Sequence, residues 1–148
     1  MTHPENPRLL LDTHVFLWLL LGAAELQHSL QRPAIESAAE RESLFLSAVS
    51  VWEIAAMERY GVLRFSMPLQ VWLQKALETP GLRLVSVDRE ISFAAATLPD
   101  RFSGDFADRC IVATARTHNC LLITADSAIH AYAQRGYVRA VGIEEEGA

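Results

Sequence analysis

Short runs of apolar residues alternate along the chain with longer segments whose apolar residues recur at helical spacing. The short runs predict five strands, at residues 8–12, 44–48, 82–87, 120–124 and 138–142. The longer segments predict helices at residues 13–22, 29–42, 50–61, 68–78, 88–99, 105–119 and 126–136. Glycine or proline ends several of these helices, and Pro33 is expected to interrupt the second one.

The predicted strands are apolar throughout and are separated by helices. This order is typical of an α/β fold, in which helices cover both faces of a parallel sheet. The chain is expected to form one domain over residues 1–148, with a core at about 8–142 and loose tails at both ends. In such sheets, ligands bind beyond the carboxyl ends of the strands.

The chain is acidic overall, with a net charge of −5 over 148 residues. Proteins that bind nucleic acid usually show a basic surface. If this chain binds a polyanion, the negative charge of its carboxylates must be compensated at the binding site. Apolar residues make up 51% of the chain, which indicates that a partner covers some apolar surface.

Several features favour a cytoplasmic protein without a membrane segment. Cys110 and Cys120 have apolar neighbours and no metal-binding or disulfide spacing, as expected of reduced thiols. The apolar stretch 15–24 is shorter than the roughly 20 residues that a bilayer-spanning helix needs. The first eight residues lack the basic-then-apolar order of a signal peptide.

Three aspartates, Asp12, Asp88 and Asp126, lie between a predicted strand and a predicted helix. Capping of the helix explains each of them, because a carboxylate accepts hydrogen bonds from the first backbone N–H groups and is favoured by the helix dipole. A place in a site at the sheet edge is the other interpretation. The local pattern alone does not separate the two.

Three further acids are harder to explain as surface charges. Glu53 lies among apolar neighbours in the predicted helix 50–61, so its carboxylate needs a hydrogen-bond partner or a metal. Asp105 and Asp108 lie on one side of a helix's first turn, where Asp105 fits an N-cap and Asp108 is less readily explained. If these acids meet the strand-end aspartates, their repulsion requires protonation or a cation, and all-oxygen ligands favour Mg²⁺ or Mn²⁺.

Four segments in this order resemble the PIN-domain family, and more narrowly the VapC-type toxins of bacterial toxin–antitoxin pairs. They are LLLDTHVFLWLL, SAVSVWEIAAMERYGVLRF, LPDRFSGDFADRCIVATAR and LLITAD, and the resemblance extends from about residue 8 to residue 140. It implies a three-layer α/β/α sandwich with a five-stranded parallel sheet whose first strand is central. It also implies a Mg²⁺-dependent endoribonuclease, the toxin of such a pair, that hydrolyses RNA by attack of water at phosphorus.

The resemblance assigns five candidate catalytic residues, namely Asp12, Glu53, Asp105, Asp108 and Asp126. Asp12 and Asp108 are expected to bind the metal directly. The other three would bind through water, orient a ligand or support a second ion. Asp88 serves as a control for Asp12, because it has the same pattern of a strand followed by an aspartate. The family topology places its strand at the edge of the sheet, away from the site, so we expect Asp88 only to cap a helix.

Residues near these acids carry further expectations. Thr13 and Thr124 would hydrogen-bond carboxylates or metal-bound water, or would only satisfy the backbone. Arg101 and Arg109 would contact phosphate, and the alternative for Arg109 is an ion pair with Asp105.

The resemblance also implies partners, namely an RNA substrate, a second copy of the chain in a homodimer, and a cognate antitoxin that covers the site. The predicted first helix is apolar nearly all round, which fits burial in a larger assembly or in the core of this domain. Trp18, Trp52 and Trp72 are expected to pack in the core or at an interface rather than to stack on bases.

Two other functions remain alternatives. One is a structure-specific DNA nuclease of PIN type, which the small size of the chain disfavours. The other is a non-catalytic metal-binding regulatory module such as a phospho-acceptor receiver. That module needs a lysine late in the sheet, whereas the only lysine, Lys75, lies in the predicted helix 68–78.

Overall fold

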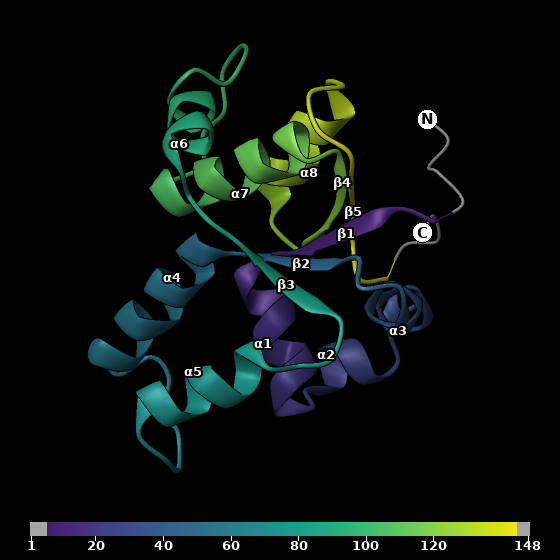
Figure 1. Ribbon diagram of the computed structural model, residues 1–148. Helices are drawn as coiled ribbons and strands as arrows, with labels where there is room; N and C mark the ends of the chain where they lie inside the picture. The colour runs from purple at the N-terminus through teal and green to yellow at the C-terminus, as the bar shows by residue number, and fades with distance from the viewer. Residues whose placement is uncertain (1–5, 145–148) are drawn as a thin grey trace.

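The computed structural model describes residues 6–144. Residues 1–5 and 145–148, which belong to the tails predicted to be loose, lie outside the described residues. Figure 1 shows a central sheet with helices packed on both of its faces. The predicted α/β/α sandwich is therefore confirmed.

Within residues 6–144 the sheet has five parallel strands, in the order β3-β2-β1-β4-β5. In chain order they are β1 (Arg8–Leu11), β2 (Leu44–Ser47), β3 (Leu82–Val85), β4 (Cys120–Ile123) and β5 (Ala140–Val141). β1 is central and pairs with β2 on one side and with β4 on the other. Leu11 lies opposite Ile123, so the carboxyl ends of β1 and β4 are level. The residues that follow these two strands are therefore neighbours in space.

Helices form the two outer layers. They are α1 (Thr13–Leu21), α2 (Ala24–Gln27), α3 (Arg32–Glu40), α4 (Ala48–Arg59), α5 (Leu69–Leu77), α6 (Arg89–Ala96), α7 (Phe106–Thr117) and α8 (Ser127–Gln134). In Figure 1, α6, α7 and α8 cover one face of the sheet, and α1, α3 and α5 cover the other. Side chains of β1 alternate between the layers, with Leu10 in the core under α7 and Leu9 and Leu11 in the core over α1.

Pro33 does not interrupt a helix, so the predicted helix 29–42 is wrong at its start. α3 begins at Arg32, and Pro33 lies in its first turn. The missing N–H of proline is harmless there, because the first N–H groups of a helix have no intrahelical partner. The short helix α2 was not predicted either.

Two other details differ from the predicted pattern. α4 begins at Ala48, earlier than predicted, because the Ser47 side chain caps it by accepting a hydrogen bond from the Val49 N–H at 3.1 Å. β3 was predicted to be apolar and buried, yet the Leu84 side chain is 47% exposed. β3 lies at the edge of the sheet and has only one neighbouring strand, which leaves it less covered.

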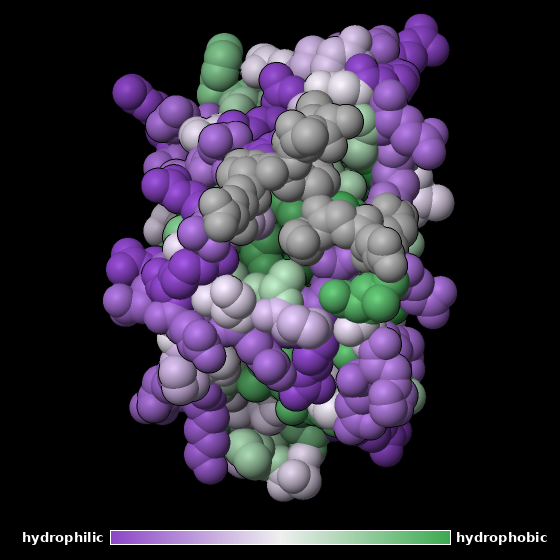
Figure 2. Space-filling model, turned by 90° about the vertical axis from the view of Figure 1, so that its right-hand side faces the viewer, coloured by the Kyte–Doolittle hydropathy of each residue, from purple (hydrophilic) through white to green (hydrophobic). Residues whose placement is uncertain are grey.

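Hydrophilic residues make up most of the face on the right-hand side of Figure 1, as Figure 2 shows. This is the side from which β1 enters the sheet, opposite the carboxyl ends of the strands. Between residues 6 and 144, none of the helices has the length and apolar character needed to cross a bilayer.

Candidate active site

The aspartates that follow β1 and β4 both cap helices. The Asp12 carboxylate accepts a hydrogen bond from the Thr13 N–H at 2.8 Å, at the start of α1. The Asp126 carboxylate accepts bonds from the Ala128 and Ile129 N–H groups at 2.8 and 3.1 Å, at the start of α8. The capping interpretation is therefore correct for both residues, and it leaves each carboxylate at the carboxyl edge of the sheet.

Asp105 and Asp108 cap α7 reciprocally. The Asp108 N–H donates to Asp105 Oδ1 at 2.9 Å, and the Asp105 N–H donates to Asp108 Oδ2 at 3.3 Å. This capping box also gives Asp108 a structural role, which the sequence analysis did not predict. Both carboxylates therefore lie at the start of α7, close to each other.

Glu53 is the one candidate acid in the middle of a helix. Its Oε1 accepts a hydrogen bond from the Thr13 hydroxyl at 2.5 Å, and the same hydroxyl lies 2.7 Å from the Ser50 hydroxyl. Thr13 has a single hydroxyl proton, so Ser50 must donate to Thr13 when Thr13 donates to Glu53. Ser50 was missed by the sequence analysis, although its place one turn before Glu53 on α4 could have indicated it.

The five candidate acids line a single cleft of about 400 Å³. Its walls consist of Asp12, His14, Trp18, Glu53, Asp105, Asp108, Ala125 and Asp126. We call it the carboxylate cleft. Asp88 is absent from these walls. It caps α6 by accepting a bond from the Ile91 N–H at 2.9 Å, as predicted.

Burial and mutual repulsion raise the pKa values of three of these acids. Desolvation by burial is the main cause of the raised pKa of Asp12 and of Glu53, and it outweighs the hydrogen bonds that each accepts from a threonine. Burial, followed by the charges of Asp105 and Asp126, raises the pKa of Asp108 to about 7.

No lysine or arginine forms an ion pair with any of the five acids within residues 6–144. The ion pairs in this part of the chain join Arg32 to Glu36 and Arg135 to Asp100. The carboxylate cleft is therefore short of positive charge at neutral pH, and a divalent cation would relieve this deficit.

The donor set of the cleft fits Mg²⁺. All five side chains offer oxygen, which hard cations prefer. Among the described residues, no three acids, histidines or cysteines are arranged as a complete cage for an ion. Mg²⁺ does not require one, because it keeps several waters and binds proteins through one or two carboxylates together with substrate phosphate.

Thr124 connects the two strand-end aspartates. Its hydroxyl donates to Asp12 Oδ2 at 2.5 Å and accepts from the Asp126 N–H at 2.9 Å. Thr124 and Thr13 thus both bond carboxylates, as predicted for these threonines.

Substituting Thr124→Val is expected to destabilise the protein by about 1–3 kcal/mol, because buried Asp12 loses a hydrogen-bond donor and the Asp126 N–H loses its acceptor, while the shape of the side chain is retained. Urea unfolding measures this loss. Thr114→Val is the matched control, since Thr114 is equally buried but bonds the Cys110 carbonyl, which the backbone of α7 already satisfies. Equal losses in the two variants would contradict a specific role for the bond to Asp12.

Arg109 does not pair with Asp105, so that alternative is wrong. Its guanidinium donates to the backbone carbonyls of Ala95, Phe102 and Ala96 at 2.9, 3.2 and 3.4 Å. The last carbonyls of a helix lack partners within it, and Arg109 satisfies those at the end of α6.

The three tryptophans have different environments. Trp72 packs in the core, with ring centroids 4.5 Å from Phe65 and 6.5 Å from Phe16. Trp18 is half-buried in a wall of the carboxylate cleft. Trp52 is 62% exposed, so core packing is wrong for this residue, and an interface there stays a prediction.

Comparison with known proteins places the chain in a family. The model of the PIN domain matches residues 9–134. Ribonuclease VapC22 from Mycobacterium tuberculosis is 32% identical over 124 residues, which cover 84% of this chain and 91% of that protein.

Solved structures share the fold at lower sequence identity. The DNA-bound VapBC structure from Salmonella typhimurium has a chain that superposes with a TM-score of 0.64 at 12% identity, over 92% of this chain and 98% of that one. A toxin–antitoxin complex from Klebsiella pneumoniae has a TM-score of 0.55 at 20% identity, over 80% of this chain and 86% of that one. Sequence and fold therefore agree with the predicted resemblance, and the chain belongs to the PIN-domain family.

Proposed function

We propose that this protein is a Mg²⁺-dependent endoribonuclease that hydrolyses RNA phosphodiester bonds and acts as the toxin of a toxin–antitoxin pair. The observation that carries the proposal is the meeting of five carboxylates in one cleft, without an ion pair to lysine or arginine among the described residues. The 32% identity to Ribonuclease VapC22 supports RNA as the substrate.

The five acids have different proposed roles. Asp12 and Asp108 hold the ion directly, with Mn²⁺ as a possible substitute for Mg²⁺. A bound ion would activate a water and offset charge at the phosphate. Glu53, Asp105 and Asp126 contact the ion through water, orient the substrate or support a second ion. The hydroxyls of Thr13 and Thr124 fix the positions of Glu53 and Asp12.

The regulatory-module alternative finds no support in the cleft. A phospho-acceptor receiver needs a lysine beside its acids, whereas Lys75 lies on α5 and is not among the residues that line the cleft. The DNA-nuclease alternative is tested by comparing the cleavage of RNA with the cleavage of DNA.

We also propose a cognate antitoxin and a homodimer as partners, and the cytoplasm as the location. The similarity to the Klebsiella pneumoniae toxin–antitoxin complex supports an antitoxin. An apolar hollow of about 500 Å³, with exposed Trp52 and Phe106 in its walls, offers a partner a place beside the carboxylate cleft. Free, buried Cys110 and Cys120 fit a reducing compartment.

The test uses purified, antitoxin-free protein with total RNA, in Mg²⁺ or in EDTA. We expect RNA cleavage in Mg²⁺ and none in EDTA, because the acids alone provide no positive charge at phosphorus. Cleavage that survives EDTA would contradict the proposal. Parallel reactions with single-stranded and duplex DNA test the alternative, which faster cleavage of DNA would favour. Growth arrest on expression, relieved by an antitoxin, tests the role as a toxin.

A further inference from the structure

A second hollow, of about 610 Å³, is lined by the loop that leads into α7 and by residues of α7 and α8. Its charged lining residues are Arg101, Arg109, Arg135 and Asp100. The hollow therefore has three positive side chains and one negative side chain, in a chain whose net charge is −5. We call it the arginine hollow.

The arginine hollow borders the carboxylate cleft along two segments. Ser103 lines the hollow and Asp105 lines the cleft, with only Gly104 between them in the chain. In the first turn of α8, Ala128 lines the hollow, and Asp126, which caps that helix, lines the cleft. A polymer that leaves the cleft across either segment would meet the arginines next.

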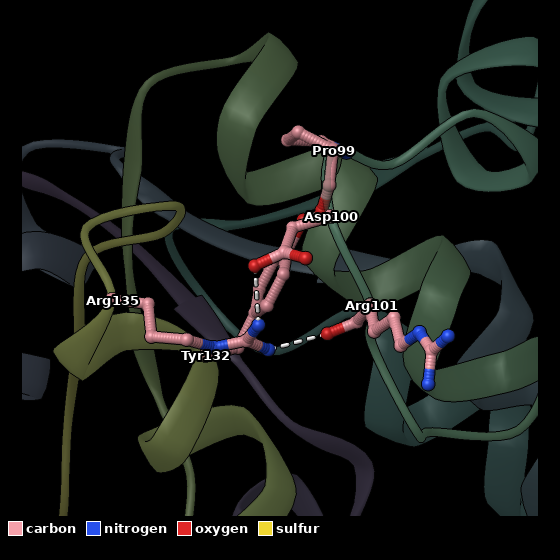
Figure 3. A network of polar contacts seen from close by, with 5 residues as sticks. All are labelled: Pro99, Asp100, Arg101, Tyr132 and Arg135. Atoms are coloured by element: carbon pink, nitrogen blue, oxygen red, sulfur yellow. Dashed lines mark hydrogen bonds and ion pairs between the residues drawn. The ribbon is translucent and has the colours of Figure 1, made fainter.

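The loop 99–101, which contributes Asp100 and Arg101 to the lining of the arginine hollow, is held by α8, as Figure 3 shows. The Tyr132 hydroxyl donates to the Pro99 carbonyl at 2.6 Å, and Arg135 Nη1 donates to Asp100 Oδ2 at 2.6 Å. Arg135 Nη2 also donates to the Arg101 carbonyl. Asp100 has a φ of +57°, a left-handed conformation that residues other than glycine rarely adopt. These contacts hold the backbone of Arg101 in one place.

The three arginines differ in what their side chains already bind. Arg135 is paired with Asp100, and Arg109 donates to three backbone carbonyls. The guanidinium of Arg101 makes no hydrogen bond or ion pair with residues 6–144, and it is exposed. In Figure 3 it extends away from Arg135. Its five N–H donors are therefore available to a ligand, in a geometry that matches a phosphate group.

We propose that Arg101 binds a backbone phosphate of the RNA strand, next to the phosphate that is cleaved. This inference rests on the proposed ribonuclease function. It adds the path of the RNA strand, from the carboxylate cleft to the arginine hollow. Arg109 contributes positive charge to the same phosphate site and is not offset by a carboxylate within the described residues. The arginine hollow thus supplies the local positive charge that the acidic chain needs to retain a polyanion beside its own carboxylates.

The test compares Arg101→Gln with Arg101→Lys and with a matched control, Arg83→Gln. Arg83 is also exposed and free of ion pairs among the described residues, but it lies on β3 and lines neither hollow nor cleft. Binding of a labelled single-stranded RNA of mixed sequence is measured over a range of salt concentrations. Cleavage of the same RNA in Mg²⁺ gives kcat and KM.

We expect Arg101→Gln to weaken RNA binding roughly tenfold and to raise KM with little change in kcat. The slope of log affinity against log salt should become shallower by about 0.7, the value for one phosphate contact on a single strand. Arg101→Lys should recover part of the affinity, and Arg83→Gln should bind like the wild type.

Equal effects of Arg101→Gln and Arg83→Gln, or an unchanged salt slope, would overturn this inference alone, since the wild type would still cleave RNA. A wild type that neither binds nor cleaves RNA would overturn the proposed function together with it. Binding of a polyglutamate peptide is measured as well, to distinguish RNA from an acidic protein segment as the ligand. If Arg101→Gln weakens binding of that peptide and not of RNA, the arginine hollow binds an acidic protein segment, and the inference is wrong.

Discussion

Replacing Asp108 with asparagine is expected to lower Mg²⁺-dependent RNA cleavage by a factor on the order of 10³. Asp108 is one of the two proposed direct ligands of the ion, and the charge stabilisation that a metal gives to phosphoryl transfer amounts to several kcal/mol. About 1.4 kcal/mol corresponds to a tenfold change in rate. Asparagine keeps an oxygen that can accept the hydrogen bond from the Asp105 N–H, so α7 should remain capped.

The same substitution is expected to stabilise the metal-free protein above pH 7. Burial and the neighbouring acids raise the pKa of Asp108 from 3.8 to about 7. Between these pH values the folded protein keeps a proton that the unfolded chain has released, so its stability decreases as pH rises from about 4 to about 7. Asparagine cannot ionise and escapes this loss. Because the carboxyl group is half-exposed and screened by water, we expect a gain of about 1 kcal/mol, or about 2–4 °C in Tm.

Asp88→Asn is the matched control for both effects. Asp88 also caps a helix after a strand, but it lies outside the carboxylate cleft, so this variant should cleave RNA like the wild type. Asp12→Asn should lose cleavage as Asp108→Asn does. Thermal unfolding at pH 8 and single-turnover cleavage measure the two effects. If Asp108→Asn kept its activity, or if Asp88→Asn lost as much, the proposed site would be wrong.

Mg²⁺ affinity is expected to fall about tenfold for each pH unit below about 7. A carboxylate must be deprotonated to bind a metal, and the pKa of Asp108 in the metal-free protein is about 7. Binding below this pH therefore displaces one proton for each ion. The raised pKa values of Asp12 and Glu53, which are caused mainly by burial, act in the same direction.

Titration calorimetry in buffers of different ionisation enthalpy measures both the Mg²⁺ affinity and the number of protons released. The proton release should disappear above about pH 8, where Asp108 is already ionised. Asp88→Asn should show the same pH dependence as the wild type, because Asp88 does not line the cleft. A Kd that stays constant between about pH 5 and 8 would mean that no raised carboxyl takes part in binding the ion.

The local pattern of residues predicted the elements of this fold well because helices, strands and caps depend on nearby residues. The apolar runs correspond to β1 to β5, and Asp12, Asp105 and Asp126 cap helices, as their type and position indicated. The wrong prediction at Pro33 also concerned a local feature, namely where the helix begins. Proline fits the first turn of a helix, where Pro33 lies, and disrupts only the interior.

Contacts between segments that are distant in the sequence could not be predicted from the local pattern of residues. Nearby spacing suggested Asp105 as a partner for Arg109, but the packing of α6 against α7 brings the carbonyls at the end of α6 to its guanidinium instead. Trp52 has the apolar neighbours of a core residue, yet α4 turns it outward. Both outcomes depend on which helices pack together.

The sequence by itself determined that acids stand at strand ends and helix starts, and the resemblance indicated which of them belong to a site. Only the tertiary structure decided which acids meet. Asp12 and Asp88 have the same local pattern, but the strand order β3-β2-β1-β4-β5 brings Asp12 beside Thr124, 112 residues away, and leaves Asp88 at the far edge. Strand order is set by how the strands and the helices that connect them pack together, which depends on the whole chain rather than on any one segment.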